Sequence, residues 1–219
     1  MKRSIKETLA RVVILFIGLT IAHLGVTFFL LADLGADPFN VLVQGVFRTL
    51  LAFTASPLLT HGRTHIAICF LIILVLLIID RSYIKIGTLL CMICGGPIID
   101  VFTSLLGGFH FENFPLPQKI LLLTLGCCIL AYGMTIVIQS DAGTGPNDLV
   151  AVVISDKTHK KFNIVRVCTD VSFVLIGFLL GGSFGIGTII CAFVVGPIAG
   201  FFLPINKKLI NKLLLSQNS

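Results

Sequence analysis

The sequence predicts an all-α, polytopic helical membrane protein built from two internal repeats of about four helical segments each. Hydrophobic residues make up 56% of the 219-residue chain and charged residues 12%, and the mean hydropathy is +1.06. A soluble domain of this size cannot bury so much apolar surface. Apolar runs approach the ~20 residues that cross a bilayer as a helix, and none alternates like a barrel strand.

The repeat is predicted from residues that recur at fixed offsets. Six of them return 108 positions later: Gly18, Gly25, Thr27, Asp33, Gly35 and Pro38 are matched by Gly126, Gly133, Thr135, Asp141, Gly143 and Pro146. Another seven return 100 positions later: Ile86, Gly87, Thr88, Cys91, Gly96, Pro97 and Ile98 are matched by Ile186, Gly187, Thr188, Cys191, Gly196, Pro197 and Ile198. We therefore expect one membrane domain, residues 1–219, with repeats at 11–106 and 119–204.

Each repeat is expected to hold three long spans and one short helix. The long spans come from the apolar runs 12–31, 66–79, 86–106, 120–138, 171–180 and 186–203. The run 12–31 resembles a signal peptide, but the chain repeats it internally, so we treat it as a span. Two of the eight segments, 38–53 and 146–155, are short and follow Gly-Pro turns. Residues 205–219 are expected to form a cytoplasmic basic tail, with a short surface helix over 206–215.

The two short helices decide the topology. If both cross the membrane, there are eight spans, the halves run parallel, and only Arg81 and Lys85 among the basic residues lie outside. If both are re-entrant, there are six spans, the halves are inverted, and Arg48, Arg63 and Lys119 lie outside. The eight-span arrangement is the preferred expectation. Both arrangements place the basic termini in the cytoplasm of a bacterial cell membrane.

Composition also excludes several function classes. The net charge is +6, but the cations sit at the ends of apolar runs, which indicates membrane topology and not nucleic-acid binding. The seven cysteines lie in hydrophobic segments, which is typical of small buried packing residues, so we expect neither a metal site nor a cofactor. The chain has no H-E-x-x-H motif, and we expect no enzyme activity.

The candidate site lies at the two Gly-Pro turns. Asp33 and Asp37 precede the first short helix, whereas Asp141, Asn147 and Asp148 surround the start of the second. The N-termini of these helices are expected to face a cavity near the repeat axis, where they could hold an anionic group. Helix capping is the simpler interpretation of Asp37 and Asp148. For the matched pair Asp33 and Asp141, a functional role and a structural role have equal weight.

Further polar residues follow each turn. Asn40, Gln44 and Arg48 recur every four residues, so they share one face of the first short helix and form either a polar seam or the wall of an aqueous path. Arg166 and Asp170 are also four residues apart and are expected to pair within a span.

At these residues the chain resembles the YczE/YyaS/YitT group of bacterial multi-pass membrane proteins, and within that group the YczE-like branch. The resemblance covers nearly the whole chain. It rests on Ala32-Asp33-Leu34-Gly35 with Pro38, Gln44-Gly45, Gly143, Gly145-Pro146 with Asp148, Arg166 with Asp170, Gly181-Gly182, Gly187-Thr188, Gly196-Pro197 and Leu203-Pro204. Asn147 stands where the group often has a basic residue, and Asp170 where glutamate is common. The resemblance implies a multi-pass membrane protein.

Two functions remain open from the sequence. A small-solute transporter, binding its solute or a coupling ion at the repeat interface, explains the duplication and the broken segments. A membrane accessory or scaffold protein, which modulates a partner enzyme or its expression, explains the small size. A polar pocket that joins Asp33, Gln44, Asp141 and Arg166 would favour transport, and a dry interior would favour the scaffold. The chain could act alone or as a homo-oligomer in the lipid bilayer.

Overall fold

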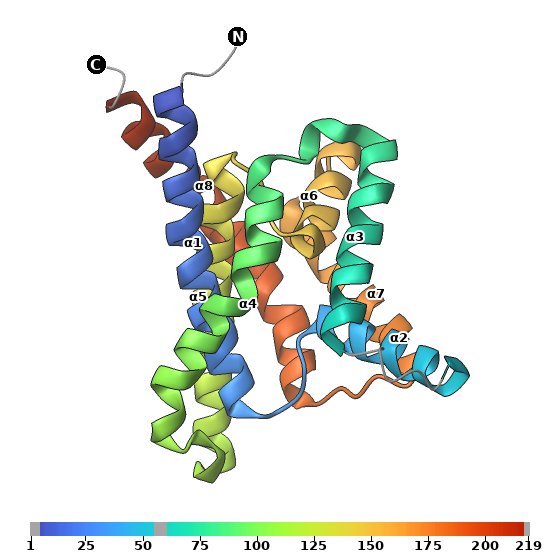
Figure 1. Cartoon of the computed structure of the whole chain (residues 1–219). Helices are drawn as coiled ribbons and strands as arrows, with labels where there is room; N and C mark the ends of the chain where they lie inside the picture. Colours follow the sequence, from blue (N-terminus) through green and yellow to red (C-terminus); the bar gives the residue numbers. More distant parts are fainter. Residues whose placement is uncertain (1–4, 55–60, 217–219) are drawn as a thin grey trace.

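The computed structural model describes residues 5–54 and 61–216, and this part of the chain is a bundle of helices without a strand (Figure 1). The helices are α1 (Ile5–Ala32), α2 (Pro38–Thr54), α3 (His61–Asp80), α4 (Ile86–Leu106), α5 (Leu116–Ser140), α6 (Pro146–Thr158), α7 (Phe162–Leu179) and α8 (Ile186–Ser216). Three short 3-10 helices, η1 (Arg81–Tyr83), η2 (Gly107–Phe109) and η3 (Phe111–Asn113), lie in the connections. The predicted all-α class is confirmed.

Within the described residues, six helices are long and apolar enough to cross a membrane: α1, α3, α4, α5, α7 and α8. The other two are shorter, because α2 has 17 residues and α6 has 13, which correspond to ~25 Å and ~20 Å of helix. Figure 1 shows α2 at the end of the bundle away from the termini, and α6 nearer the opposite end. Helix length and composition therefore favour the six-span alternative over the preferred expectation of eight crossing helices.

The helices α1 and α5 form a closely packed antiparallel pair. A Cβ atom added at Gly25 would lie 2.3 Å from the backbone nitrogen of Leu130, and one added at Gly133 would lie 2.2 Å from that of Ala22. The two backbones touch because these positions carry no side chain. Ala22 lies beside Gly133 and Gly25 lies beside Leu130, so the two helices are antiparallel. The first helices of the two halves therefore run in opposite directions, and the expectation of parallel halves is wrong.

The first loop of each half binds the last helix of the other half. At the start of α4, the Gly87 N–H donates to the Ala142 carbonyl at 2.9 Å, and at the start of α8 the Gly187 N–H donates to the Leu34 carbonyl at 2.9 Å. Leu34 and Ala142 are 108 positions apart, and Gly87 and Gly187 are 100 apart. The two contacts therefore involve matched positions in a reciprocal way. One contact lies at each end of the bundle.

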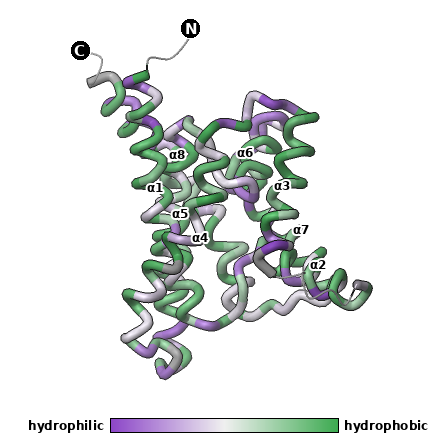
Figure 2. The backbone as a smooth tube through the Cα atoms, in the orientation of Figure 1, coloured by the Kyte–Doolittle hydropathy of each residue, from purple (hydrophilic) through white to green (hydrophobic). Residues whose placement is uncertain are grey.

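Polar residues gather toward the two ends of the bundle, and hydrophobic residues cover the long helices (Figure 2). At the end where the termini lie, Lys157 donates to Asp80 at 2.8 Å. The hydrogen bond to the Asp80 carboxylate raises the pKa of the Lys157 ammonium group. Lys85 lies at the same end, whereas Arg48 contacts the α7–α8 loop at the opposite end.

The C-terminal segment differs from its expected form. Residues 205–216 are not a separate surface helix but continue α8, which runs from Ile186 to Ser216. Ile210 and Leu214 are buried against α1 and α5, and the Asn206 amide donates to Thr135 Oγ1 at 2.6 Å. The apolar residues of the segment therefore pack onto protein and continue the last helix.

Candidate functional site

A cavity of about 580 Å³ lies where the two short helices begin. Its lining includes residues from both halves of the chain. The polar members are His23, Asp37, Asn40, His65, Asn147, Asp148 and Arg166, and the remaining lining is mostly apolar. Five of these seven, Asp37, Asn40, Asn147, Asp148 and Arg166, are residues that the sequence predicts as site candidates.

The first short helix begins at the cavity with a carboxylate cap. Asp37 precedes Pro38, the first residue of α2, and its Oδ1 accepts the backbone N–H of Asn40 at 3.2 Å. Its other oxygen, Oδ2, accepts the side-chain amide of Asn40 at 2.6 Å. The predicted capping role of Asp37 is confirmed. The carboxylate also lines the cavity, so capping and ligand contact are compatible.

The second short helix begins at the same cavity with different chemistry. Its N-cap is Gly145, which offers no side-chain acceptor to the first turn of α6. Asn147 and Asp148 follow, and the Asn147 amide donates to Asp148 Oδ1 at 3.0 Å. An uncapped helix start carries a partial positive charge. Here the first-turn carboxylate of Asp148 faces that charge.

Arg166 on α7 joins the second helix start to a buried carboxylate. Its Nη1 lies 2.5 Å from Asp148 Oδ1 and its Nε lies 2.9 Å from Asp170 Oδ2. Arg166 is 8% exposed and Asp170 is 1% exposed. The predicted pairing of Arg166 with Asp170 is confirmed, and Asp148 is a second partner that spacing along one helix could not reveal. Asp170 does not itself line the cavity, and its Oδ1 is buried without a hydrogen-bond partner in the described residues.

The matched acids Asp33 and Asp141 lie outside the cavity. Both occupy the left-handed backbone region, with φ of 50° and 56°, directly after α1 and α5. Asp and Asn tolerate this conformation better than most residues. The match between them therefore reflects a shared turn geometry, which ends a helix ahead of Gly35 and Gly143.

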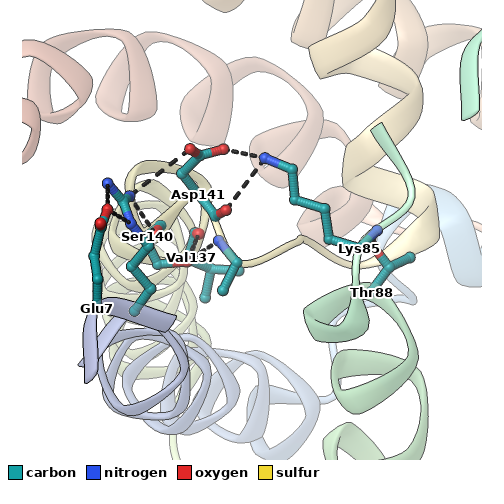
Figure 3. A network of polar contacts seen from close by, with 8 residues as sticks. Glu7, Lys85, Thr88, Val137, Ser140 and Asp141 are labelled. Atoms are coloured by element: carbon teal, nitrogen blue, oxygen red, sulfur yellow. Dashed lines mark hydrogen bonds and ion pairs between the residues drawn. The ribbon is translucent and has the colours of Figure 1, made fainter. Parts of the chain in front are cut away.

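Asp141 is held by a network of polar contacts at the end of α5 (Figure 3). Lys85 pairs with its carboxylate and also donates to its backbone carbonyl at 3.2 Å. Arg11 lies 3.7 Å from the same carboxylate and donates to the Ser140 carbonyl at 3.0 Å. By contrast, the side chain of Asp33 is exposed and contacts no partner in the described part of the chain. The environments of the two acids differ because Gly185 occupies the position that matches Lys85.

The polar face of α2 mostly binds a loop. Gln44 Oε1 accepts the backbone N–H of Ser183 at 2.7 Å, and Arg48 donates to the Gly181 carbonyl at 2.6 Å and to Ser183 Oγ at 2.9 Å. Gln44 and Arg48 therefore form the polar seam that we considered beside the aqueous path. Only Asn40 of this face reaches the cavity. Of the four residues proposed to share a pocket, the structure brings Arg166 to it and leaves Asp33, Gln44 and Asp141 elsewhere.

Two histidines and one aromatic side chain at the cavity were not among the predicted site residues. His23 on α1 and His65 on α3 line the cavity. The His23 Nδ1 lies 2.8 Å from the Leu19 carbonyl, and the His65 ring packs edge-on against Phe39 at 5.3 Å between centroids. A polar residue within an apolar span was the available signal. No group of three His, Cys, Asp or Glu side chains in the described residues is arranged to hold a metal ion.

These features define a multi-pass helical membrane protein with a cavity between its helices. The chain belongs to the DUF6198 family, a family of unknown function, whose model matches residues 9–204. The match contains every residue that lines the cavity. The YczE-like resemblance inferred from the sequence motifs is confirmed.

Relatives cover nearly the whole chain. It is 29% identical over 207 residues to a Bacillus subtilis (strain 168) protein named "Uncharacterized membrane protein YczE", which covers 94% of this chain and 91% of the relative. A Haemophilus influenzae protein is 28% identical over 196 residues, with 90% and 84% covered, and "Uncharacterized protein YyaS" of Bacillus subtilis is 23% identical over 202 residues, with 92% and 94% covered. No solved structure matches.

Proposed function

We propose that the protein is a small-solute transporter of the bacterial cytoplasmic membrane, and that its halves form an inverted repeat with the solute site at their interface. One observation carries the proposal: the N-termini of α2 and α6, at matched positions of the halves, open into one cavity lined from both sides. Interrupted helices that begin at a shared mid-molecule cavity are typical of transporters with inverted repeats. We propose transport and not catalysis.

The reciprocal loop contacts suggest how the cavity opens. The contact of Gly87 with Ala142 lies near the end of the bundle that carries the termini, and the contact of Gly187 with Leu34 lies near the other end. Both contacts are present in this structure. In the proposed cycle, one contact breaks while the other holds, so the cavity opens to one side at a time. The α1–α5 pair stays fixed as the axis because its backbones touch.

The charge distribution supports an orientation with both termini in the cytoplasm. Lys85 and Lys157 lie at the end of the bundle near the termini, and Arg48 lies at the other. Cytoplasmic loops of membrane proteins are enriched in Lys and Arg. A cysteine introduced at Lys160 should react with an impermeant thiol reagent from the cytoplasmic side, and one at Ser183 from the outside. The reverse pattern would contradict this orientation.

A comparison of metabolites in cells tests transport without a known solute. Three matched strains would express the wild-type protein, the double variant Asp37→Asn/Asp148→Asn, or no protein. Their internal and external solutes would be measured by untargeted mass spectrometry. We expect at least one solute whose distribution follows wild-type expression and reverts in the double variant, at equal membrane abundance. If no solute redistributes, or the variant behaves as the wild type, the protein is better explained as the accessory or scaffold protein.

A further inference from the structure

The acids around the cavity outnumber the cations. Among the residues that the structure describes, Arg166 is the only Lys or Arg in the lining, and its guanidinium already contacts both Asp148 and Asp170. One positive charge therefore serves two carboxylates. This neutralisation is incomplete. Asp170 is 1% exposed, and its Oδ1 has no hydrogen-bond partner in the described residues.

Asp37 has no cationic partner at all among the described residues. Both of its carboxylate oxygens accept only from Asn40, through the backbone N–H and the neutral side-chain amide. The α2 N-terminus adds a partial positive charge of roughly half a unit. An ionised group inside a membrane protein is costly unless it is paired, solvated or used by a ligand. Asp37 is half-buried and lines the cavity, so its carboxylate is open to a cationic group bound there.

The remaining walls suit an apolar molecule. Phe29 and Phe39 line the cavity together with Val26, Leu130 and Met134. An aromatic ring attracts a cation that lies over its face. A volume of about 580 Å³ falls in the range of pockets that hold small organic molecules, roughly 300–1,000 Å³. A hydrated inorganic ion would gain little from such walls, because hard cations are bound by several oxygen ligands.

We propose that the cavity binds a small organic cation, an amine with an apolar body, and that the Asp37 carboxylate is its counterion. This inference names the substrate class and so rests on the proposed function for its meaning in the cell. Binding can be measured without transport, so the two ideas can fail separately. The ammonium group donates to Asp37 at the start of α2, and the apolar body lies against the aromatic and aliphatic walls.

The test uses the purified full-length protein and three probes of similar shape. Phenethylamine is the cation, 2-phenylethanol is its uncharged counterpart, and 3-phenylpropanoate is the anion. Titration calorimetry would measure the affinity of each. We expect the amine to bind at least tenfold more tightly than the alcohol and the carboxylate, because a charge-assisted hydrogen bond contributes more than a neutral one. Equal binding of all three probes, preferred binding of the anion, or binding of none would overturn the inference.

Variants assign the charge preference to Asp37. Asp37→Asn should weaken amine binding about ten- to hundredfold and leave alcohol binding unchanged, because Asn caps a helix about as well as Asp. Asp37→Ser is a second neutral capping variant, for use if the first does not fold. Asp33→Asn, at an exposed acid outside the cavity, is the matched control and should bind as the wild type. An unchanged amine affinity in both Asp37 variants would refute the counterion role.

The outcomes separate the inference from the transport proposal. If the amine binds through Asp37 but no solute redistributes in cells, the cation site stands and transport fails. If a solute without a cationic group redistributes and the amine does not bind, transport stands and the cation inference fails.

Discussion

Removing the Arg166 guanidinium tests the most buried ionic contacts of the protein. Arg166→Met keeps an apolar stem of similar length but leaves Asp148 and Asp170 without their cation. Asp170 is 1% exposed and cannot regain water by a small movement. Breaking a buried pair by removing one partner costs about 3–5 kcal/mol. At about 2–4 °C per kcal/mol for a chain of this size, we expect the melting temperature to fall by about 6–20 °C.

A thiol-reactive fluorescent dye can measure this unfolding in detergent. Four cysteines, Cys69, Cys91, Cys127 and Cys191, are buried and free. They react only when the bundle opens, so the dye signal reports tertiary unfolding. Replacing the exposed Cys168 and the partly exposed Cys94 and Cys128 by serine or alanine in every variant lowers the reaction of the folded protein.

A double variant distinguishes an unpaired charge from lost packing. Arg166→Met/Asp170→Leu removes both members of the most buried pair and should recover at least half of the lost melting temperature, because an apolar replacement of a buried ion pair is often tolerated. Arg166→Lys should fall between the wild type and Arg166→Met, because an ammonium group cannot contact both carboxylates with the geometry of a guanidinium. A melting temperature of Arg166→Met within about 2 °C of the wild type would refute the reasoning. So would a double variant as unstable as the single one.

Two further predictions concern the bundle axis and the matched acids. Gly133→Val should abolish folded protein in size-exclusion chromatography, because even its Cβ would lie 2.2 Å from a backbone atom of α1. Gly96 has open space around it, so Gly96→Ala is the control and should be tolerated. Equal yields of the two variants would contradict the close packing of α1 and α5. Asp141→Asn should lower the melting temperature by about 2–4 °C, since partly exposed ion pairs contribute about 1 kcal/mol or less. Asp33→Asn should leave it unchanged, and equal shifts would argue against the structural role of the Asp141 network.

The helices were predictable because each arises from local features of the sequence. Apolar runs predict where the six long spans lie, although the run 171–180 covers only the second half of α7, and the Gly-Pro turns predict where α2 and α6 begin. Asp37 could be recognised as a cap because Pro38 follows it at the first helical position. The direction of the halves was not predictable in this way. It depends on whether two short helices cross, and one basic residue separated the two topologies in the count of charges.

The candidate site was predicted in part. Residues next to the helix starts, such as Asn147 and Asp148, lie at the cavity because the backbone places them there. The repeated acids Asp33 and Asp141 were a misleading signal, because recurrence marks any shared constraint, including a left-handed turn. The Asp148–Arg166 contact joins two helices, so no spacing rule predicts it. His65 also depends on tertiary packing, because only the contact between α2 and α3 brings it near Phe39.

The central claim is that the cavity opens to each side of the membrane in turn, and cysteine accessibility tests it most directly. A single cysteine would replace Asn147, which lines the cavity, in a protein whose native cysteines are replaced by serine or alanine. An impermeant trimethylammonium thiosulfonate would be applied to right-side-out and to inside-out vesicles. A transporter with alternating access predicts reaction from both sides, with one-sided reaction at a cysteine placed at Ser183. Reaction of the Asn147 cysteine from neither side, or from one side only, would contradict the account.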